Sequence, residues 1–169
     1  AVVEKYTTVE LNQFQYDAHV ALAYNIGEGQ YRSSSVLRFT NERRWEDAAA
    51  AFSLFVWATS SRPSEIQKKA KSLQPIIGAD GRWKGPDGQP CDYRQAFEGL
   101  KKRHDCEGLL SLGLDWSECK VSLDAERVWD GRQNRWEDVV TDATPFAKVK
   151  EKALLLPRLV LADPPAQPA

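Results

Sequence analysis

The clearest helical pattern of the chain lies between residues 45 and 56. Apolar side chains recur there at the three- and four-residue spacing of one helix face, at positions Trp45, Ala48, Ala49, Phe52, Phe55 and Val56. The run of alanines allows a neighbouring helix to approach closely, and the aromatic side chains supply bulk. A chain with this stripe is expected to build a helical core in which Phe52 is buried.

A second helix is predicted before this stripe and a short one between the two. Residues 12–26 have apolar side chains near the helical period, and Gly27 follows as a typical stop. The serines at residues 33–35 offer hydroxyl caps for a short helix over residues 36–40. The first third of the chain is therefore predicted to consist of helices, with a short turn at residues 28–30.

Two capping-box patterns predict helices in the middle of the chain. The pairs are Ser64 with Gln67 and Asp92 with Gln95. The first would open a polar helix to about Leu73 that Pro75 stops, and the second a helix that ends at Gly113. Residues 148–156 are predicted to form a last helix, which Pro157 ends.

Glycine and proline dominate the stretch GADGRWKGPDGQP over residues 78–90. Its two Asp-Gly pairs indicate tight turns, and a small hairpin there would expose Trp83. The wider segment 60–90 has few large apolar residues. We therefore predict that residues 60–90 are an insertion that buries little surface.

The last part of the chain, residues 115–169, has a weaker pattern and is predicted to be an irregular extension. Strand-like residues over 121–136 surround the turn sequence DGRQN, which lies between Trp129 and Trp136. If exposed, these tryptophans and Trp83 would bind glycan or a protein partner, but burial under loops is expected. The chain ends in ADPPAQPA, a proline-rich tail that is expected to be flexible.

Composition excludes several classes of function. The formal net charge is −1, which gives no pull toward nucleic acid or an anionic membrane. No apolar run reaches the roughly 18 residues of a membrane span, and no signal segment opens the chain. The chain contains no Met, so Ala1 is expected to be a processed or cut end, or the residue after a removed initiator.

The cysteine pattern predicts neither a metal site nor a cofactor. There are three cysteines, Cys91, Cys106 and Cys119, so at least one thiol is unpaired within the chain. His104 lies close to Cys106, but the spacing matches no known ligand pattern, and only His19 offers another imidazole. A free or incidentally paired thiol is the expected state.

Three elements in order carry a family resemblance. Residues 11–18 read LNQFQYDA and residues 24–27 read YNIG. Tyr31, Ser34, Ser35, Leu37, Arg38 and Asn41 then fit a pattern FxxSTxLRxLN, and residues 44–49 read RWEDAA. These elements resemble the helical C-terminal lobe of the phage-type lysozymes. The family's closing motif resembles residues 99–109, which lie unusually far after Trp57.

The resemblance implies a mainly α fold and a division of the chain. Residues 1–114 would form the lysozyme-like helical lobe, interrupted by the insertion at 60–90, and residues 115–169 the extension. The implied partner is the glycan strand of peptidoglycan, acted on in the periplasm or at the cell wall of a bacterial host.

Six residues are candidates for substrate binding by this resemblance: Tyr24, Asn25, Gly27, Ser34, Ser35 and Trp57. Asn25 and Gly27 would otherwise merely end a helix. The two serines are expected to act first as caps, and core packing of Trp57 is favoured over stacking on a sugar. Arg103 is expected to make a structural ion pair, and Glu28 lies in a turn that could touch substrate.

The family's catalytic acid is not found. Its pattern is a Glu, eight residues, an Asp or Cys, five residues and a Thr, and no Glu of the chain satisfies it. A glycosidase needs a proton donor beside the scissile bond, so no catalytic residue is predicted here. The chain is expected to supply the cleft lobe of a muramidase whose catalytic lobe would precede it. Alternatives are a non-catalytic module that binds glycan or protein, and a structural phage or secretion-apparatus subunit.

Overall fold

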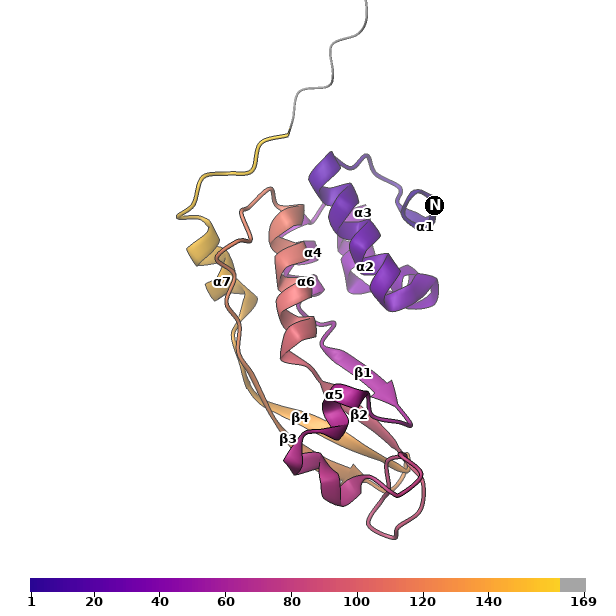
Figure 1. Ribbon diagram of the computed structural model, residues 1–169. Coiled ribbons are helices and arrows are strands. Elements are labelled where there is room, and N and C mark those ends of the chain that lie inside the picture. The colour runs from indigo at the N-terminus through magenta and orange to yellow at the C-terminus, as the bar shows by residue number, and fades with distance from the viewer. Residues whose placement is uncertain (162–169) are drawn as a thin grey trace, which may run out of the picture. The chain divides into compact units, whose positions relative to one another are not determined.

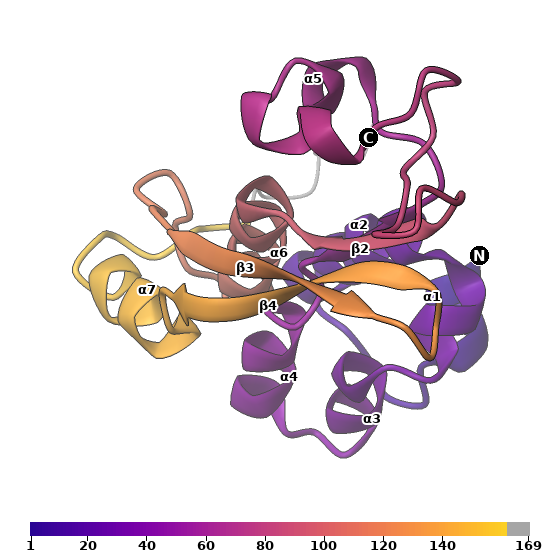
Figure 2. The same cartoon turned by 90° about the horizontal axis from the view of Figure 1, so that it is seen from below.

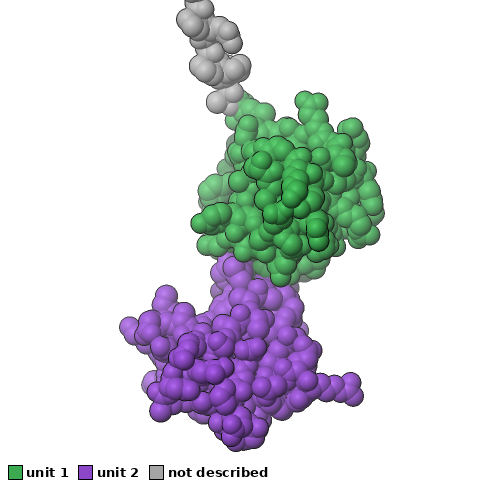
Figure 3. All heavy atoms as spheres, turned by 90° about the vertical axis from the view of Figure 1, so that its right-hand side faces the viewer, with its two compact units in different colours: residues 1–55, 101–121, 144–169 green, residues 56–100, 122–143 purple. Residues whose placement is uncertain are grey.

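The structure is a computed structural model that describes residues 1–161, so the proline-rich tail predicted to be flexible lies outside the described residues (Figure 1). Contacts group the chain into two compact units (Figure 3). We call the first the helical unit, which holds the described residues 1–55, 101–121 and 144–161. The second, the sheet unit, holds residues 56–100 and 122–143.

The helical unit is built from six helices: α1 (Val2–Tyr6), α2 (Gln13–Arg32), α3 (Ser35–Asn41), α4 (Trp45–Phe52), the part of α6 (Glu98–Ser111) from Lys101 on, and α7 (Phe146–Ala153). One buried cluster joins α1 to α4 through Val3, Ala18, Leu22, Tyr31, Val36, Leu37, Ala51 and Phe52. A second joins α4, α6 and α7 through Ala49, Leu109, Leu114, Cys119, Phe146, Val149 and Ala153. Because α4 contributes to both clusters, its apolar stripe connects the two halves of this core.

Local sequence signals fix where α2 and α3 begin and where α2 bends. Asn12 and Gln15 form a reciprocal capping box at the start of α2, and the Ser34 hydroxyl accepts the backbone N–H of Leu37 at the start of α3. Gly27 has φ 82°, a conformation that side chains disfavour, and it kinks α2. The predicted stop at Gly27 is therefore a kink, since helical turns continue to Arg32.

α4 and α6 approach each other closely at a glycine. A Cβ added at Gly108 would lie 2.6 Å from the backbone oxygen of Ala49, closer than real Cβ contacts. Small residues at this crossing let the two helix backbones meet, as the alanine run of α4 predicted. α4 ends at Phe52, so Phe55 and Val56 lie beyond the helix that the stripe suggested.

The sheet unit contains a four-stranded mixed sheet in the order β1-β2-β4-β3 (Figure 1), and Figure 2 shows β2, β4 and β3 from below. The strands are β1 (Trp57–Ser60), β2 (Asp92–Ala96), β3 (Leu123–Asp130) and β4 (Arg135–Ala143). β1 pairs antiparallel with β2, β2 pairs parallel with β4, and β3 and β4 form an antiparallel hairpin. A short α5 (Glu65–Lys68) and a 3₁₀ helix η1 (Lys71–Ile76) come between β1 and β2 in the chain.

Aromatic side chains form the core of the sheet unit. Trp83 is fully buried and meets Tyr93 edge to face at 5.1 Å between ring centroids. Trp129 and Trp136 pack against this pair from neighbouring strands, with their own centroids 5.0 Å apart. The expected burial of Trp83 is confirmed, and the other two tryptophans are partly buried.

Several expectations from the sequence need correction. A mainly α fold is too simple a description, because the sheet unit is built on a mixed sheet. Asp92 and Gln95 lie in β2 and do not open a helix, since pairing with two neighbouring strands overrides the local cap pattern. The last third of the chain is not irregular, because it forms the β3–β4 hairpin and α7.

The structure also groups residues differently from the expected division at Leu114. Residues 122–143 complete the sheet unit, and α7 completes the core of the helical unit. The segment 60–90 contributes Ile76 and Trp83 to a core, so it buries more than its composition suggested. Whether it was inserted into an ancestral lobe stays a prediction.

Candidate functional site

An open groove of about 480 Å³ lies on the helical unit between α2 and α6. Its lining residues are Tyr16, Asp17, Val20, Ala21, Tyr24 and Asn25 from α2, and Arg103 and Glu107 from α6. On α2 these positions repeat every four residues, and the two on α6 are also four apart. Such a spacing places side chains along one helix face, so each helix contributes one wall.

A direct hydrogen bond joins the two walls. The guanidinium of Arg103 donates to the Asn25 side-chain oxygen at 3.1 Å, across 78 positions of sequence. Both side chains are exposed, so the bond is weak but sets their orientation. The expected ion pair of Arg103 is replaced by this contact with an amide.

Tyr24 stands at this groove with its ring almost entirely in solvent. It is 90% exposed, more than any other large apolar side chain recorded within residues 1–161. An aromatic face beside Asn25 and Arg103 offers one apolar surface and several hydrogen-bonding groups. This combination suits a ligand that has both flat apolar faces and polar edges.

Two buried polar pairs form within α6, and one of them also reaches the segment after α4. The His104 ring lies 2.6 Å from the Glu107 carboxylate. The same ring makes a T-shaped contact with the ring of Phe55. One turn earlier, the Lys101 ammonium contacts Asp105 at 2.8 Å and the Ser53 hydroxyl at 3.1 Å. The Glu107 carboxylate therefore lines the groove while His104 fixes it from the protein interior.

A third buried polar group holds α2 against α3. His19 is 2% exposed, with one ring nitrogen 2.7 Å from the Tyr31 hydroxyl and the other 3.1 Å from Thr40. Burial lowers the pKa of His19 to about 4, so the ring is neutral at physiological pH. With both nitrogens bonded, His19 is a structural residue and does not face the groove.

Glu28, which sequence reasoning placed near substrate, is bound by α1. Its carboxylate accepts hydrogen bonds from Lys5 at 2.9 Å and from the Tyr6 hydroxyl at 2.6 Å. The contact with Lys5, followed by that with Tyr6, lowers the pKa of Glu28. A carboxyl group that stays ionised in this way is a poor proton donor at neutral pH.

The structure places the six predicted residues at different positions. Tyr24 and Asn25 line the groove, whereas Gly27 lies at the kink just beyond it. Ser34 is buried as the α3 cap and donates to the Tyr31 carbonyl at 2.8 Å, and Ser35 begins that helix. Trp57 belongs to the other unit, where it is partly buried in β1 with the Arg94 guanidinium 3.9 Å from its ring centroid. Substrate contact stays a prediction for all six.

The groove also contains residues that sequence reasoning missed. These are Tyr16, Asp17, Val20, Ala21 and Glu107, with Arg103 assigned a different role. The four-residue repeat of Tyr16, Val20 and Tyr24 was a usable signal, because three large side chains on one face of a helix are either core or site. Nothing local indicated that α6 supplies the opposite wall.

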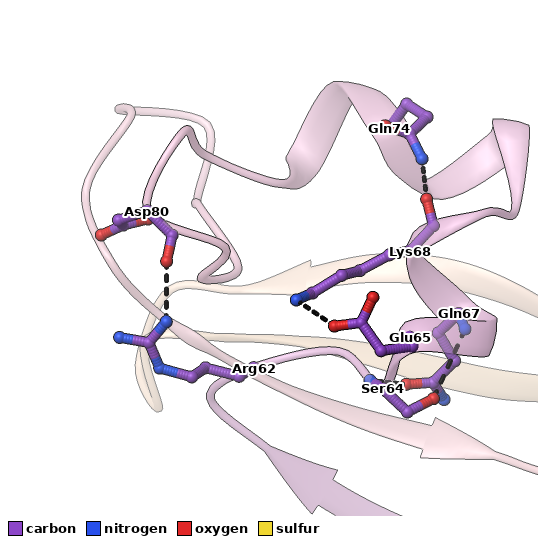
Figure 4. A network of polar contacts seen from close by, with 7 residues as sticks. All are labelled: Arg62, Ser64, Glu65, Gln67, Lys68, Gln74 and Asp80. Atoms are coloured by element: carbon purple, nitrogen blue, oxygen red, sulfur yellow. Dashed lines mark hydrogen bonds and ion pairs between the residues drawn. The ribbon is translucent and has the colours of Figure 1, made fainter.

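A second hollow, of about 380 Å³, lies on the sheet unit. It is lined by Ala58, Ser60, Arg62, Ser64, Gln67, Phe97 and Leu100. Figure 4 shows that the polar groups around α5 largely bind one another: Arg62 donates to the Asp80 carbonyl at 2.7 Å, and Lys68 pairs with Glu65 at 2.8 Å. The capping box of Ser64 and Gln67 completes this network, which therefore organises the segment 60–90.

Residues 1–161 contain no group of three or more His, Cys, Asp and Glu side chains arranged to hold a metal ion. His104 is bonded to Glu107, and Cys106 packs against the buried cluster that contains Cys119. Within the same described part of the chain, no helix is long and apolar enough to cross a membrane.

Comparisons with known proteins place the first part of this chain in a class. The phage lysozyme family model matches residues 1–72, which cover α1 to α4 and the start of the sheet unit. The endolysin of Bacillus phage PZA is 50% identical over 50 residues, which is 30% of this chain and 19% of that protein. The endolysin of Salmonella phage P22 is 41% identical over 58 residues, 34% of this chain and 38% of that protein. Residues 1–72 are therefore phage-lysozyme-like.

The chain thus spans only about a fifth to two fifths of the length of these relatives. Among solved structures, the muramidase domain of SpmX from Asticaccaulis excentricus is 25% identical, with a TM-score of 0.43, over 66% of this chain and 55% of that one. The family match ends before α6, so the resemblance of residues 99–109 to the family's closing motif stays a prediction.

Proposed function

We propose that this chain is part of a peptidoglycan-cleaving lysozyme and that its helical unit supplies one wall of the substrate cleft. The observation that carries the proposal is the position of Tyr24 and Asn25. They belong to a motif within the segment that matches the phage lysozyme family, and they line the open groove. The relatives of that segment are endolysins.

The chemistry of the groove fits a glycan strand. Sugar rings have apolar faces that stack on aromatic side chains, and the exposed ring of Tyr24 offers such a surface. The Arg103 guanidinium has N–H groups beyond the one bonded to Asn25, and these can donate to hydroxyl or N-acetyl oxygens. Asp17 and Glu107 can accept from sugar hydroxyls along the same groove.

No group of the chain is assigned the role of proton donor. The family's glutamate pattern is met by no Glu in the sequence, and Glu107 is engaged by His104. Hydrolysis of a glycosidic bond requires an acid next to the leaving oxygen and a second group on the other side of the sugar. The chain therefore contributes binding and positioning, which stabilise a bound strand without cleaving it.

Binding of purified peptidoglycan sacculi tests the proposal. The chain is expected to cosediment with sacculi, and Tyr24→Ala should weaken this binding about 5- to 10-fold through loss of stacking worth about 1 kcal/mol. Ile66→Ala removes an apolar side chain of the sheet unit that is 85% exposed, close to the 90% of Tyr24, and serves as the matched control. Equal loss in both variants, or no binding by the unchanged chain, would contradict the proposal.

A turbidity assay on permeabilised cells separates binding from cleavage. The chain alone is expected not to clear the suspension, because the general acid contributes about 10²- to 10⁴-fold to such reactions. Clearing that disappears when Glu107 is changed to Gln would reveal a catalytic role for that groove carboxylate.

A further inference from the structure

Two of the three cysteines lie together in the core of the helical unit. Cys119 is 6% exposed and belongs to the buried cluster between α6 and α7, and Cys106, on α6, packs against that cluster. Cys91 belongs to the core of the sheet unit, with Trp83 and Tyr93. The helical unit therefore contains a pair of cysteines, whereas the sheet unit contains a single cysteine.

The two thiols form a hydrogen-bonded couple in which they differ in acidity. The Cys119 thiol donates to Cys106, which lowers the pKa of Cys106, and the nearby Lys102 ammonium acts in the same direction. The same hydrogen bond, together with burial, raises the pKa of Cys119. Cys106 is also the more exposed of the two, so it is the sulfur that an outside disulfide reaches first.

We propose that Cys106 and Cys119 form an intramolecular disulfide by exchange with a small disulfide such as oxidised glutathione, and that this bond fastens the segment 112–121 to α6. The Cys106 thiolate attacks one glutathione sulfur and releases one glutathione thiolate. Cys119 gives up its proton, attacks the Cys106 sulfur, and releases the second glutathione. Two protein thiols are oxidised and one glutathione disulfide is reduced to two thiols.

The segment that the bond would hold has no regular secondary structure, and it is attached to the core of the helical unit by Leu114 and Cys119. Residues 112–121 contain no helix or strand beyond the end of α6, and a turn is closed by the Cys119 N–H bonded to the Trp116 carbonyl at 3.0 Å. Cys106 lies between Arg103 and Glu107 on α6. The bond would therefore act on the helix that forms one wall of the groove, although the thiol chemistry does not depend on the proposed function.

Thiol counting on the full chain tests the pairing. Titration in denaturant is expected to find three thiols before incubation with oxidised glutathione and one afterwards, with a non-reduced digest linking the peptides of Cys106 and Cys119. Cys91→Ser should go from two thiols to none. Cys119→Ser should show no intramolecular link and should keep glutathione on Cys106. Circular dichroism checks that both variants fold.

The thermal midpoint of the chain tests whether the disulfide fastens residues 112–121 to α6. The bond closes a loop from residue 106 to residue 119, and a loop of this length predicts a thermal midpoint raised by roughly 10 °C relative to the reduced chain. Reduction should reverse the rise, and Cys119→Ser should show none. Three thiols persisting after oxidation, or a bond that includes Cys91, would overturn the pairing, and a linked chain with an unchanged midpoint would overturn the fastening.

Discussion

The helical unit and the sheet unit bury different kinds of side chain. In the helical unit the buried set includes His19, Lys101, His104, Asp105 and Glu107, each with a polar partner from its own or another segment. In the sheet unit the buried cluster is built around the aromatic rings of Trp83 and Tyr93. Buried polar groups cost free energy unless they are paired, whereas aromatic burial is favourable in many geometries.

This difference indicates where the shape of the candidate site is set. The Arg103 and Glu107 wall of the groove depends on α6, which buries two ionisable pairs within the helix and bonds through Lys101 to Ser53 after α4. The sheet unit can lose one ring contact and keep its topology, but a lost partner in the helical unit leaves an unpaired charge. Three changes test this contrast, and the first has the largest expected effect.

Replacing residues 61–90 by a short Gly-Ser linker is expected to unfold the sheet unit. The change removes Trp83 and Ile76, two of the four residues that form its buried cluster. Near-ultraviolet circular dichroism should lose its tryptophan signal, while a thermal transition of the helical unit remains. A shortened chain with one unchanged cooperative transition would instead show that the segment is a dispensable insertion.

Phe52→Ala is expected to destabilise the helical unit by about 3–5 kcal/mol, because the ring is fully buried between α2 and α4. Leu54→Ala, two residues on, removes a side chain that is 62% exposed and should change stability by less than about 0.5 kcal/mol. Urea denaturation followed by far-ultraviolet circular dichroism measures both. A loss below about 1 kcal/mol for Phe52→Ala would contradict its place in the core.

Lowering the pH from 7 to 5 is expected to cost the helical unit about 2 kcal/mol through His19. Its pKa falls from about 6.5 in the unfolded chain to about 4 on folding, so the unfolded chain binds more protons between these values. The contribution of neutral His19 to the free energy of unfolding is fully present above pH 6.5 and is lost as the pH falls toward 4. Urea denaturation at both pH values should show a smaller loss for His19→Gln than for the unchanged chain. An equal loss in both would assign the effect to other groups.

The helical part of the fold could largely be predicted from the sequence because its signals are local. The stripe that begins at Trp45, the Ser34 cap and the stop at Gly113 all act within a few residues, and the structure has α4, α3 and the end of α6 near these places, although α4 ends at Phe52. The hairpin was indicated by DGRQN between strand-like residues. Its partner β2 was missed because Asp92 and Gln95 imitate a helix cap.

Only one of the two walls of the candidate site could be predicted from the sequence. Tyr24 and Asn25 carried a motif, and the four-residue spacing of Tyr16 with Tyr24 would have extended that wall. The other wall depends on α6 meeting α2, which joins Asn25 to Arg103 across most of the chain. A pairing of helices that distant has no local sequence signature, since any amphipathic helix could provide the second surface.

The interleaving of the two units determines the order in which the chain can fold during synthesis. Ala49 shares its buried cluster with Leu109 and with Phe146, which the ribosome adds about 100 residues later. At about 5–20 residues per second, the apolar face of α4 would wait roughly 5–20 s for its last partner. The sheet unit cannot close earlier, because β4 also comes late. Newly made chains of this protein should therefore depend on chaperones that shield α4 until α7 emerges.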